Sequence, residues 1–229
     1  GFPQITRPAF SDKQKQEVFM RPKVVIAGIL DTKGEEIKFI AQAVREAGGE
    51  PTVMELSVGK ETGWADIGLS ELLVPIGKKP ADLYAVDRHK AAGWVTEAAI
   101  LRAGEMLREG KLDGIIGFGG SMGASISSAV MQSLPIGVPK MLVTTMASGE
   151  VRPYVGTKDI CMMYPIAEAG LNSLTKQILT NAAYGIVGMA EAASRGEQAA
   201  DRMHDVRRYN ALRTACLTEY GEAGLRRHN

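Results

Sequence analysis

Short apolar runs alternate with longer amphipathic segments from Lys23 onward. The run KVVIAGIL (23–30) is typical of a buried strand, and the helical pattern that follows at about 35–47 ends at Gly48-Gly49. The alternation continues with expected strands at 51–58, 113–118, 139–145 and 159–164 and expected helices at about 88–109, 122–133 and 166–194. Because apolar strands that alternate with helices form a parallel sheet covered on both faces, we predict a doubly wound α/β fold, Rossmann- or flavodoxin-like, with a mostly parallel sheet.

The two ends of the chain lack this periodicity. Residues 1–19 are interpreted as an N-terminal arm, with Met20 as the biological start of the protein. The α/β domain is expected to occupy residues 20–195, and residues 196–229 are interpreted as an atypical C-terminal tail.

Polar and glycine-rich residues gather where three of the predicted strands end. DTKG (31–34) ends the first strand, GGSMG (119–123) follows the strand at 113–118, and TTMASG (144–149) follows the strand at 139–145. Ligands of doubly wound folds bind in the crevice beyond the carboxyl ends of the strands. The sequence therefore predicts a ligand site built from these three loops.

Composition narrows the classes of function. The 229 residues carry a formal net charge of +1, which does not indicate a nucleic-acid surface, and no apolar run reaches the length of a membrane span. Two cysteines and three histidines provide neither a disulfide framework nor a histidine-rich cluster, so we expect no metal site. The N-terminal residues do not have the layout of a signal peptide. We expect a cytoplasmic protein that binds neither nucleic acid nor membrane.

The glycine turn at 119–123 admits three interpretations. As G-x-S-x-G between a strand and a helix, it matches the nucleophile elbow of hydrolases. That chemistry also needs an acid and a histidine later in the chain, and only His204 and His228 follow, both in the polar tail. Because a serine without a base is a poor nucleophile at neutral pH, this interpretation is disfavoured.

A dinucleotide site is the second interpretation. Gly117, Gly119 and Gly123 form a stretched G-x-G-x-x-x-G, which is not the standard spacing. The acid that binds the ribose is expected at the end of the next strand, at 139–145, but the first acid beyond that strand is Glu150. The match to a dinucleotide fingerprint is therefore weak.

The third interpretation is a cradle for a phosphate or carboxylate. Glycines in the turn let backbone amides approach an anion closely, and the helix that starts near Met122 adds the positive end of its dipole. Ser121 is expected to cap this helix and to donate to the anion, while Lys33 supplies a cation from a neighbouring strand end. No G-x-x-x-x-G-K-[ST] motif occurs, so this is not a P-loop. Two structural alternatives stay open: a tight turn made for packing, and a simple helix cap at Asp31 or Thr32.

Two long blocks of the sequence resemble one known family. They are VVIAGILDTKGEEIKFIAQAVREAGGEP (24–51) and GFGGSMGASISSAVMQSLPIGVPKMLVTTMASGEVRPYVGTKDICMMYP (117–165), with a further match at 169–190. From about Arg21 to Ala193 the chain resembles the Tm-1-like ATP-binding family, also called the UPF0261 family. The family is named for a plant virus-resistance protein whose N-terminal region binds ATP and blocks viral replication.

The resemblance implies a nucleotide site in the strand-end loops, with ATP, with or without Mg²⁺, as the ligand. The positions that match the motifs of the family are Asp31, Thr32, Lys33, Gly119, Gly120, Ser121, Gly123, Thr144, Thr145, Ser148, Arg152 and Asp159. The turn departs from the family in one respect, because it has GGSMGA where relatives commonly have GGSGGT. Met122 thus replaces a glycine and Ala124 a threonine, which removes a hydroxyl and narrows the cradle for a phosphate.

The family usually continues into a second α/β subdomain that begins near a segment like TMFGVTTPCV. Here the chain instead runs through MHDVRRYNALRT (203–214). When the reading frame is shifted by one base, permitted codons for this stretch read CMTFGVTTPCV. We therefore expect the residues from about Glu197 onward to be the product of a frameshift, and the gene is expected to encode a second subdomain in the next frame.

The residues and the resemblance together favour a nucleotide-binding domain. Two other hypotheses are an enzyme that acts on a small phosphorylated or carboxylated metabolite, with Lys33 or Asp31 in acid–base work, and a structural assembly domain with an inactive site. A homo-oligomer is also expected. The predicted helix LNSLTKQILTNAAYGIVGMAEAA (171–193) is apolar around much of its circumference, and a half-length protein exposes surface that seeks partners.

Overall fold

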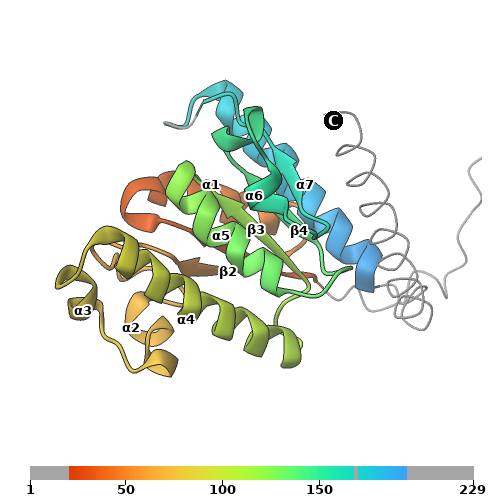
Figure 1. Cartoon of the computed structure of the whole chain (residues 1–229). Helices are drawn as coiled ribbons and strands as arrows, with labels where there is room; N and C mark the ends of the chain where they lie inside the picture. Colours follow the sequence, from red (N-terminus) through yellow and green to blue (C-terminus); the bar gives the residue numbers. More distant parts are fainter. Residues whose placement is uncertain (1–20, 168–169, 195–229) are drawn as a thin grey trace, which may run out of the picture.

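Five parallel strands form one sheet in the order β2-β1-β3-β4-β5 (Figure 1). The computed structural model describes residues 21–167 and 170–194. The strands are β1 (Lys23–Gly28), β2 (Glu50–Glu55), β3 (Gly114–Phe118), β4 (Lys140–Val143) and β5 (Cys161–Met163). The predicted parallel, doubly wound sheet is confirmed, whereas the interpretations of the N-terminal arm, of Met20 and of the tail lie outside the described residues.

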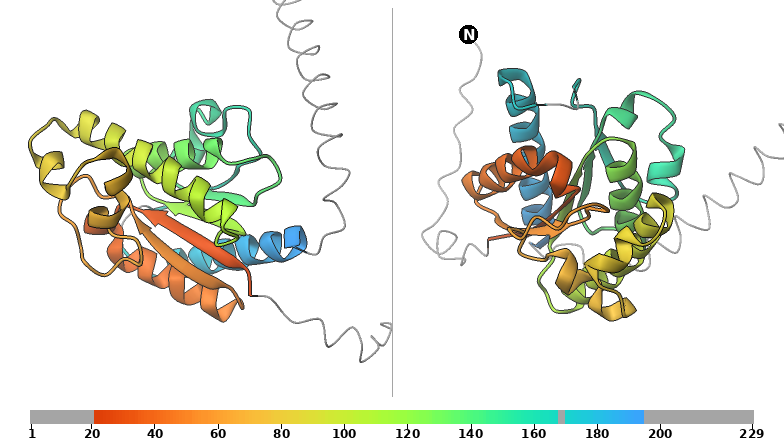
Figure 2. Two further views of the ribbon diagram at one scale, coloured as in Figure 1. Left: turned by 90° about the horizontal axis from the view of Figure 1, so that it is seen from below. Right: turned by 90° about the vertical axis from the view of Figure 1, so that its left-hand side faces the viewer.

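Helices cover both faces of the sheet. In the right-hand view of Figure 2, α1 (Leu30–Glu46) and α7 (Ser173–Ser194) lie on one face, and α4 (Arg88–Arg108) and α5 (Ser121–Ser133) lie on the other. The shorter helices are α2 (Leu69–Leu72), η1 (Val74–Ile76), α3 (Pro80–Tyr84), η2 (Thr145–Ser148) and α6 (Arg152–Val155). β1 and β3 are almost wholly buried, which explains their continuous apolar runs. No helix in the described ranges has both the length and the apolar character needed to cross a membrane.

The helices α1 and α7 begin at different residues from those that the apolar periodicity predicts. α1 begins at Leu30, so DTKG forms its first turn, and the helix is kinked at Lys33, where φ is −127° and ψ is 22°. α7 begins at Ser173 rather than at 166, because the amide of Thr175 donates to Asn172 Oδ1 at 2.9 Å and the amide of Asn172 donates to Thr175 Oγ1 at 2.9 Å. This reciprocal pair holds the start of α7.

The strand order creates a switch point between β1 and β3. From β1 the chain continues to β2 on one side, and from β3 it continues to β4 on the other. Ligands of such sheets bind in the crevice at the carboxyl ends of the strands where the order reverses. Because Gly28 pairs with Phe118, the next residues, Ile29 and Gly119, leave the sheet side by side at this crevice.

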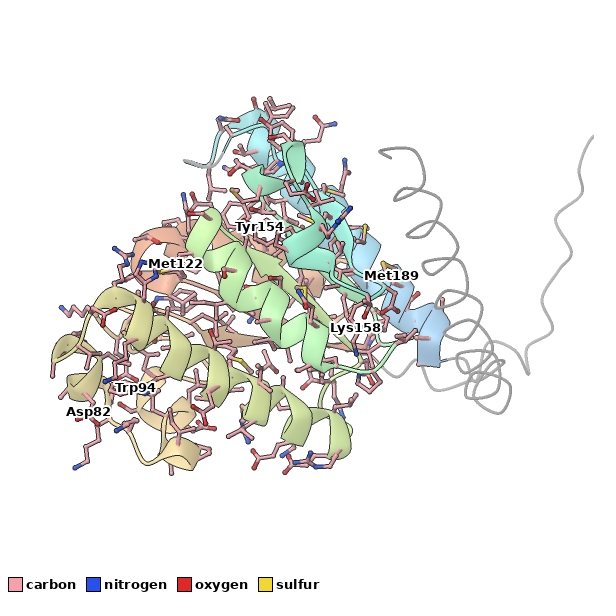
Figure 3. The ribbon with its side chains drawn as sticks, viewed as in Figure 1. Asp82, Trp94, Met122, Tyr154, Lys158 and Met189 are labelled. Carbon is pink, nitrogen blue, oxygen red and sulfur yellow. The ribbon has the colours of Figure 1, made fainter. Side chains whose placement is uncertain are left out.

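The outward face of α7 carries exposed apolar side chains. Leu174 is 46% exposed, Tyr184 51% and Met189 36%, and Met189 can be followed in Figure 3. Exposed apolar surface of this kind favours association, and the expected homo-oligomer stays a prediction. Light scattering at micromolar concentration is expected to give at least twice the 24.5 kDa mass of one chain, and a monomer would contradict it.

Candidate functional site

A small pocket lies at the switch point between β1 and β3. It encloses about 150 Å³ and is lined by residues from the starts of three helices, namely Ile29, Thr32, Lys33, Arg88, Gly119, Gly120, Ser121, Met122 and Gly123. The sequence predicted most of these positions, but it did not predict Arg88. Met122 lies in the first turn of α5 and belongs to the lining (Figure 3).

The glycines before and within the turn allow α5 to pack closely on the sheet. A Cβ atom on Gly117 would lie 2.7 Å from Cβ of Ser127 on α5, and a Cβ atom on Gly119 would lie 3.2 Å from Cα of Gly123. Both distances are shorter than ordinary van der Waals contact. Gly117 is therefore required for packing, and Gly119 is required for the close return of the chain into α5.

The start of α5 lacks the side-chain cap that the sequence led us to expect from Ser121. Its N-cap residue is Gly120, and no side chain accepts a hydrogen bond from its first amides. The first amides of any helix have no partner inside the helix. In the part of the chain that the structure describes, the amides at the start of α5 are thus available to a ligand in the pocket.

The other two helices at the pocket have their first amides occupied. In α1, the amides of Leu30 and Asp31 donate to Ser57 Oγ at 3.0 and 3.3 Å, so neither Asp31 nor Thr32 caps this helix. In α4, the carboxylate of Asp87 accepts from the amides of His89 and Lys90, both at 3.0 Å. The amide of Lys90 is the main cause that lowers the pKa of Asp87. An anion in the pocket is therefore expected at α5, not at α1 or α4.

Two cationic residues belong to the pocket lining, and no carboxylate does. Lys33 lies at the kink of α1 and is partly exposed. Arg88 is the first residue of α4 and is exposed. Arg88 lies on α4, in the long crossover that connects β2 to β3. The sequence signal that could have identified it is a basic residue directly after the aspartate that caps this helix. The charge of the lining favours a negatively charged ligand.

The remaining predicted residues near the carboxyl ends do not line the pocket. Asp31 points toward Gly59, in the loop after β2. Thr144 is buried and its Oγ1 accepts from the amide of Met146 at 3.2 Å, while Ser148 Oγ donates to the carbonyl of Thr145 at 3.0 Å within η2. Arg152 is an exposed residue at the start of α6.

Asp159 lies at the opposite edge of the sheet, which corrects its placement with the ligand loops. It lies just before β5, separated from it by Ile160, and β5 runs parallel to β4, so Asp159 is at the amino ends of the strands. There its carboxylate accepts from Lys140 Nζ at 2.8 Å and from the amide of Gly137 at 2.8 Å. Lys140 is fully buried and also donates to the carbonyls of Pro135 and Val138, both at 2.7 Å. Asp159 therefore has a structural role.

Glu55 is a buried carboxyl that the sequence analysis missed. It ends β2 inside the apolar run PTVMELSV, it is 0% exposed, and the amide of Thr62 donates to Oε1 at 3.0 Å. Burial raises its pKa, although hydrogen bonds from Ser57 and Thr62 oppose this effect. Through Ser57, which also accepts the first amides of α1, Glu55 connects β2, α1 and the loop that holds Thr62.

The raised pKa of Glu55 leads to a prediction about pH. Because burial disfavours the ionised carboxyl, the native state takes up a proton before the unfolded state as the pH falls toward the ordinary value of 4.5. This group therefore makes the protein more stable on mild acidification. Urea unfolding is expected to show that the free energy of unfolding of the wild type, relative to that of Glu55→Gln, increases as the pH is lowered from 7.5 to 5. The exposed Glu97→Gln variant serves as the control, and a difference that stays constant or decreases would contradict the prediction.

The geometry defines the class of fold, and the comparisons with known proteins define the family. The chain is a parallel α/β domain with a polar pocket at its switch point. Residues 22–195 match the family described as Uncharacterised protein family (UPF0261) N-terminal domain, and the chain belongs to this family.

Its relatives include bacterial and plant proteins. A UPF0261 protein of Clostridium tetani is 40% identical over 180 residues, which are 75% of this chain and 43% of that protein. A UPF0261 protein of Rhizobium meliloti is 38% identical over 170 residues, 73% of this chain and 42% of its own length. The ToMV resistance protein Tm-1(GCR237) of Solanum lycopersicum is 31% identical over 186 residues, 73% of this chain and 25% of its own length. The chain thus spans less than half the length of these relatives.

Proposed function

We propose that this domain binds ATP through the phosphates of the nucleotide. The observation that carries the proposal is the uncapped start of α5, which opens into a pocket with Lys33 and Arg88 in its lining. Backbone amides at a helix start and nearby cations are the groups that proteins use to hold phosphate. The resemblance to the Tm-1-like ATP-binding family supports a nucleotide rather than another anion.

The roles of the residues follow from their positions. The amides of Ser121, Met122 and Gly123 are at the start of α5 and would hold one phosphate group. Lys33 would supply the countercharge that amides lack. Within the described ranges, no group of three or more His, Cys, Asp or Glu side chains could hold a metal ion.

Replacing Lys33 with alanine tests this proposal. Lys33→Ala is expected to weaken ATP binding by about 1.5–3 kcal/mol, the usual contribution of a hydrogen bond to a charged group. The free energy of unfolding without ligand is expected to change by less than about 0.5 kcal/mol, as for most surface substitutions. Calorimetric titration of ATP into both proteins measures the first quantity, and urea unfolding measures the second.

Lys38→Ala is the matched control for this experiment. Lys38 lies on the same helix, pairs with Glu35 at 2.9 Å and is not part of the pocket lining. It should leave the affinity for ATP unchanged. Equal affinities of Lys33→Ala and the wild type would remove Lys33 from the site. If neither ATP nor any other phosphate compound binds the wild type or raises its melting temperature, the proposal fails and an inactive assembly domain is favoured.

A further inference from the structure

The pocket at the start of α5 is too small to enclose a whole nucleotide. It holds about 150 Å³, whereas sites that enclose small organic ligands usually measure roughly 300–1,000 Å³. Residues 119–123 of the turn belong to its lining. Only the end of a nucleotide fits inside, and the rest must lie outside the pocket.

The lining has no aromatic ring on which a base could stack. Bases are usually held by stacking on aromatic rings and by hydrogen bonds to their edges. No aromatic residue is among the lining residues, and the only large apolar side chains there are Ile29 and Met122.

The two tryptophans of the described chain are engaged elsewhere. Trp64 packs near Gly34 with Lys38 5.1 Å from its ring centre. Trp94 has Lys78 and Lys90 at 4.5 and 5.5 Å from its ring centre, and it lies near Asp82 of α3, whereas Met122 lies at the start of α5 (Figure 3). Neither ring lines the pocket.

The two cations of the pocket come from opposite faces of the sheet. Lys33 belongs to α1, which covers one face, and Arg88 belongs to α4, which covers the other (Figure 2). Asp87 caps α4 through the amides of the next two residues after Arg88, and this cap fixes the position from which Arg88 reaches the pocket. A guanidinium can bind two oxygens of a phosphate at once, so Arg88 suits a second phosphate group next to the one held by α5.

We infer that the pocket selects its ligand by two adjacent phosphate groups and is indifferent to the group attached beyond them. The ligand class is a diphosphate or triphosphate, free or esterified, whose organic part stays outside the pocket. One phosphate group binds the amides of α5 together with Lys33, and the next binds Arg88. This inference rests on the proposed function and adds to it that the nucleobase is not recognised.

Calorimetric titration of five compounds into the 229-residue chain tests the inference. The compounds are ATP, GTP, tripolyphosphate, pyrophosphate and orthophosphate. We expect ATP, GTP and tripolyphosphate to bind within about threefold of one another and orthophosphate to bind at least about tenfold more weakly than pyrophosphate. ATP binding more than about tenfold tighter than both GTP and tripolyphosphate would overturn the inference while leaving the proposed function intact. Equal binding of orthophosphate and pyrophosphate would also overturn it, and no binding of any compound would overturn both.

Variants of Arg88 separate a specific contact from general attraction. Arg88→Ala is expected to weaken tripolyphosphate binding by about tenfold and to leave orthophosphate binding within about twofold, and Arg88→Lys should restore part of the loss. Lys90→Ala removes the same charge two residues later without changing the pocket lining, so it should have little effect on either ligand. Equal losses in Arg88→Ala and Lys90→Ala would overturn the role of Arg88. Arg88→Gln, which keeps most of the side chain, is the second variant if Arg88→Ala does not fold.

Discussion

Replacing Gly117 with alanine is expected to lower the free energy of unfolding by about 2–3 kcal/mol, because the new Cβ atom overfills a packed interface. That atom would lie 2.7 Å from Ser127 Cβ, 2.9 Å from Ser127 Oγ and 3.2 Å from Leu142 Cδ1. Ser127 and Leu142 are both fully buried, so neither side chain can turn into solvent. The strain is relieved only if α5 moves away from β3.

Urea unfolding of Gly117→Ala measures this effect, with Gly93→Ala as the matched control. Gly93 lies on the exposed side of α4, and a Cβ atom there would meet nothing within 4 Å. Gly93→Ala is expected to stabilise the protein by about 0.5–1 kcal/mol, because alanine favours the helix over glycine. If Gly117→Ala is no less stable than the wild type, the close packing of α5 on β3 is refuted.

Removing the carboxylate of Asp159 is expected to destabilise the protein by about 2 kcal/mol without changing ligand affinity. Asp159→Ala leaves the fully buried ammonium of Lys140 with carbonyl partners only. Breaking a fully buried ion pair costs about 3–5 kcal/mol, but the side chain of Asp159 is 41% exposed, so we expect a smaller loss. Burial already lowers the pKa of Lys140, which indicates that its charge is poorly solvated.

A double-mutant cycle with Lys140→Met identifies the cause of this loss. Because Lys140→Met removes the buried charge, adding Asp159→Ala to it should cost less than adding it to the wild type. Calorimetry with ATP is expected to give the same affinity for Asp159→Ala and the wild type. A weaker affinity in a variant that is still folded would return Asp159 to the ligand site.

The position of Asp159 in the sequence was enough to place it at the amino ends of the strands, although the family motif placed it with the ligand loops at their carboxyl ends. Asp159 begins the predicted strand at 159–164, and the start of a parallel strand lies at the edge opposite to the ligand crevice. The resemblance implied Arg152 and Asp159, both from the block VRPYVGTKDI (151–160), as site residues. In the structure, residues of this block hold the chain against α5, because Gln132 Nε2 donates to the carbonyls of Pro153 and Tyr154 at 3.0 and 2.8 Å.

The pattern of apolar residues determined the parallel sheet, its two helical layers and the loops at the carboxyl ends of the strands. This was possible because the spacing of apolar residues within each strand and helix indicates which of its faces is buried. The glycine turn at 119–123 and Lys33 were predicted for the same local reason, since both directly follow a recognisable strand.

Only the tertiary structure decided which helix start is open to a ligand and which side chains surround it. Ser57 occupies the amides of α1 from a position 27 residues beyond Leu30, and Arg88 reaches the pocket from a helix on the opposite face of the sheet. Both facts depend on contacts between distant segments, which leave no periodic signal in the chain. The sequence therefore predicted ligand loops at the carboxyl edge of the sheet, whereas the packing of α1, α4 and α5 determined that the pocket forms at the start of α5.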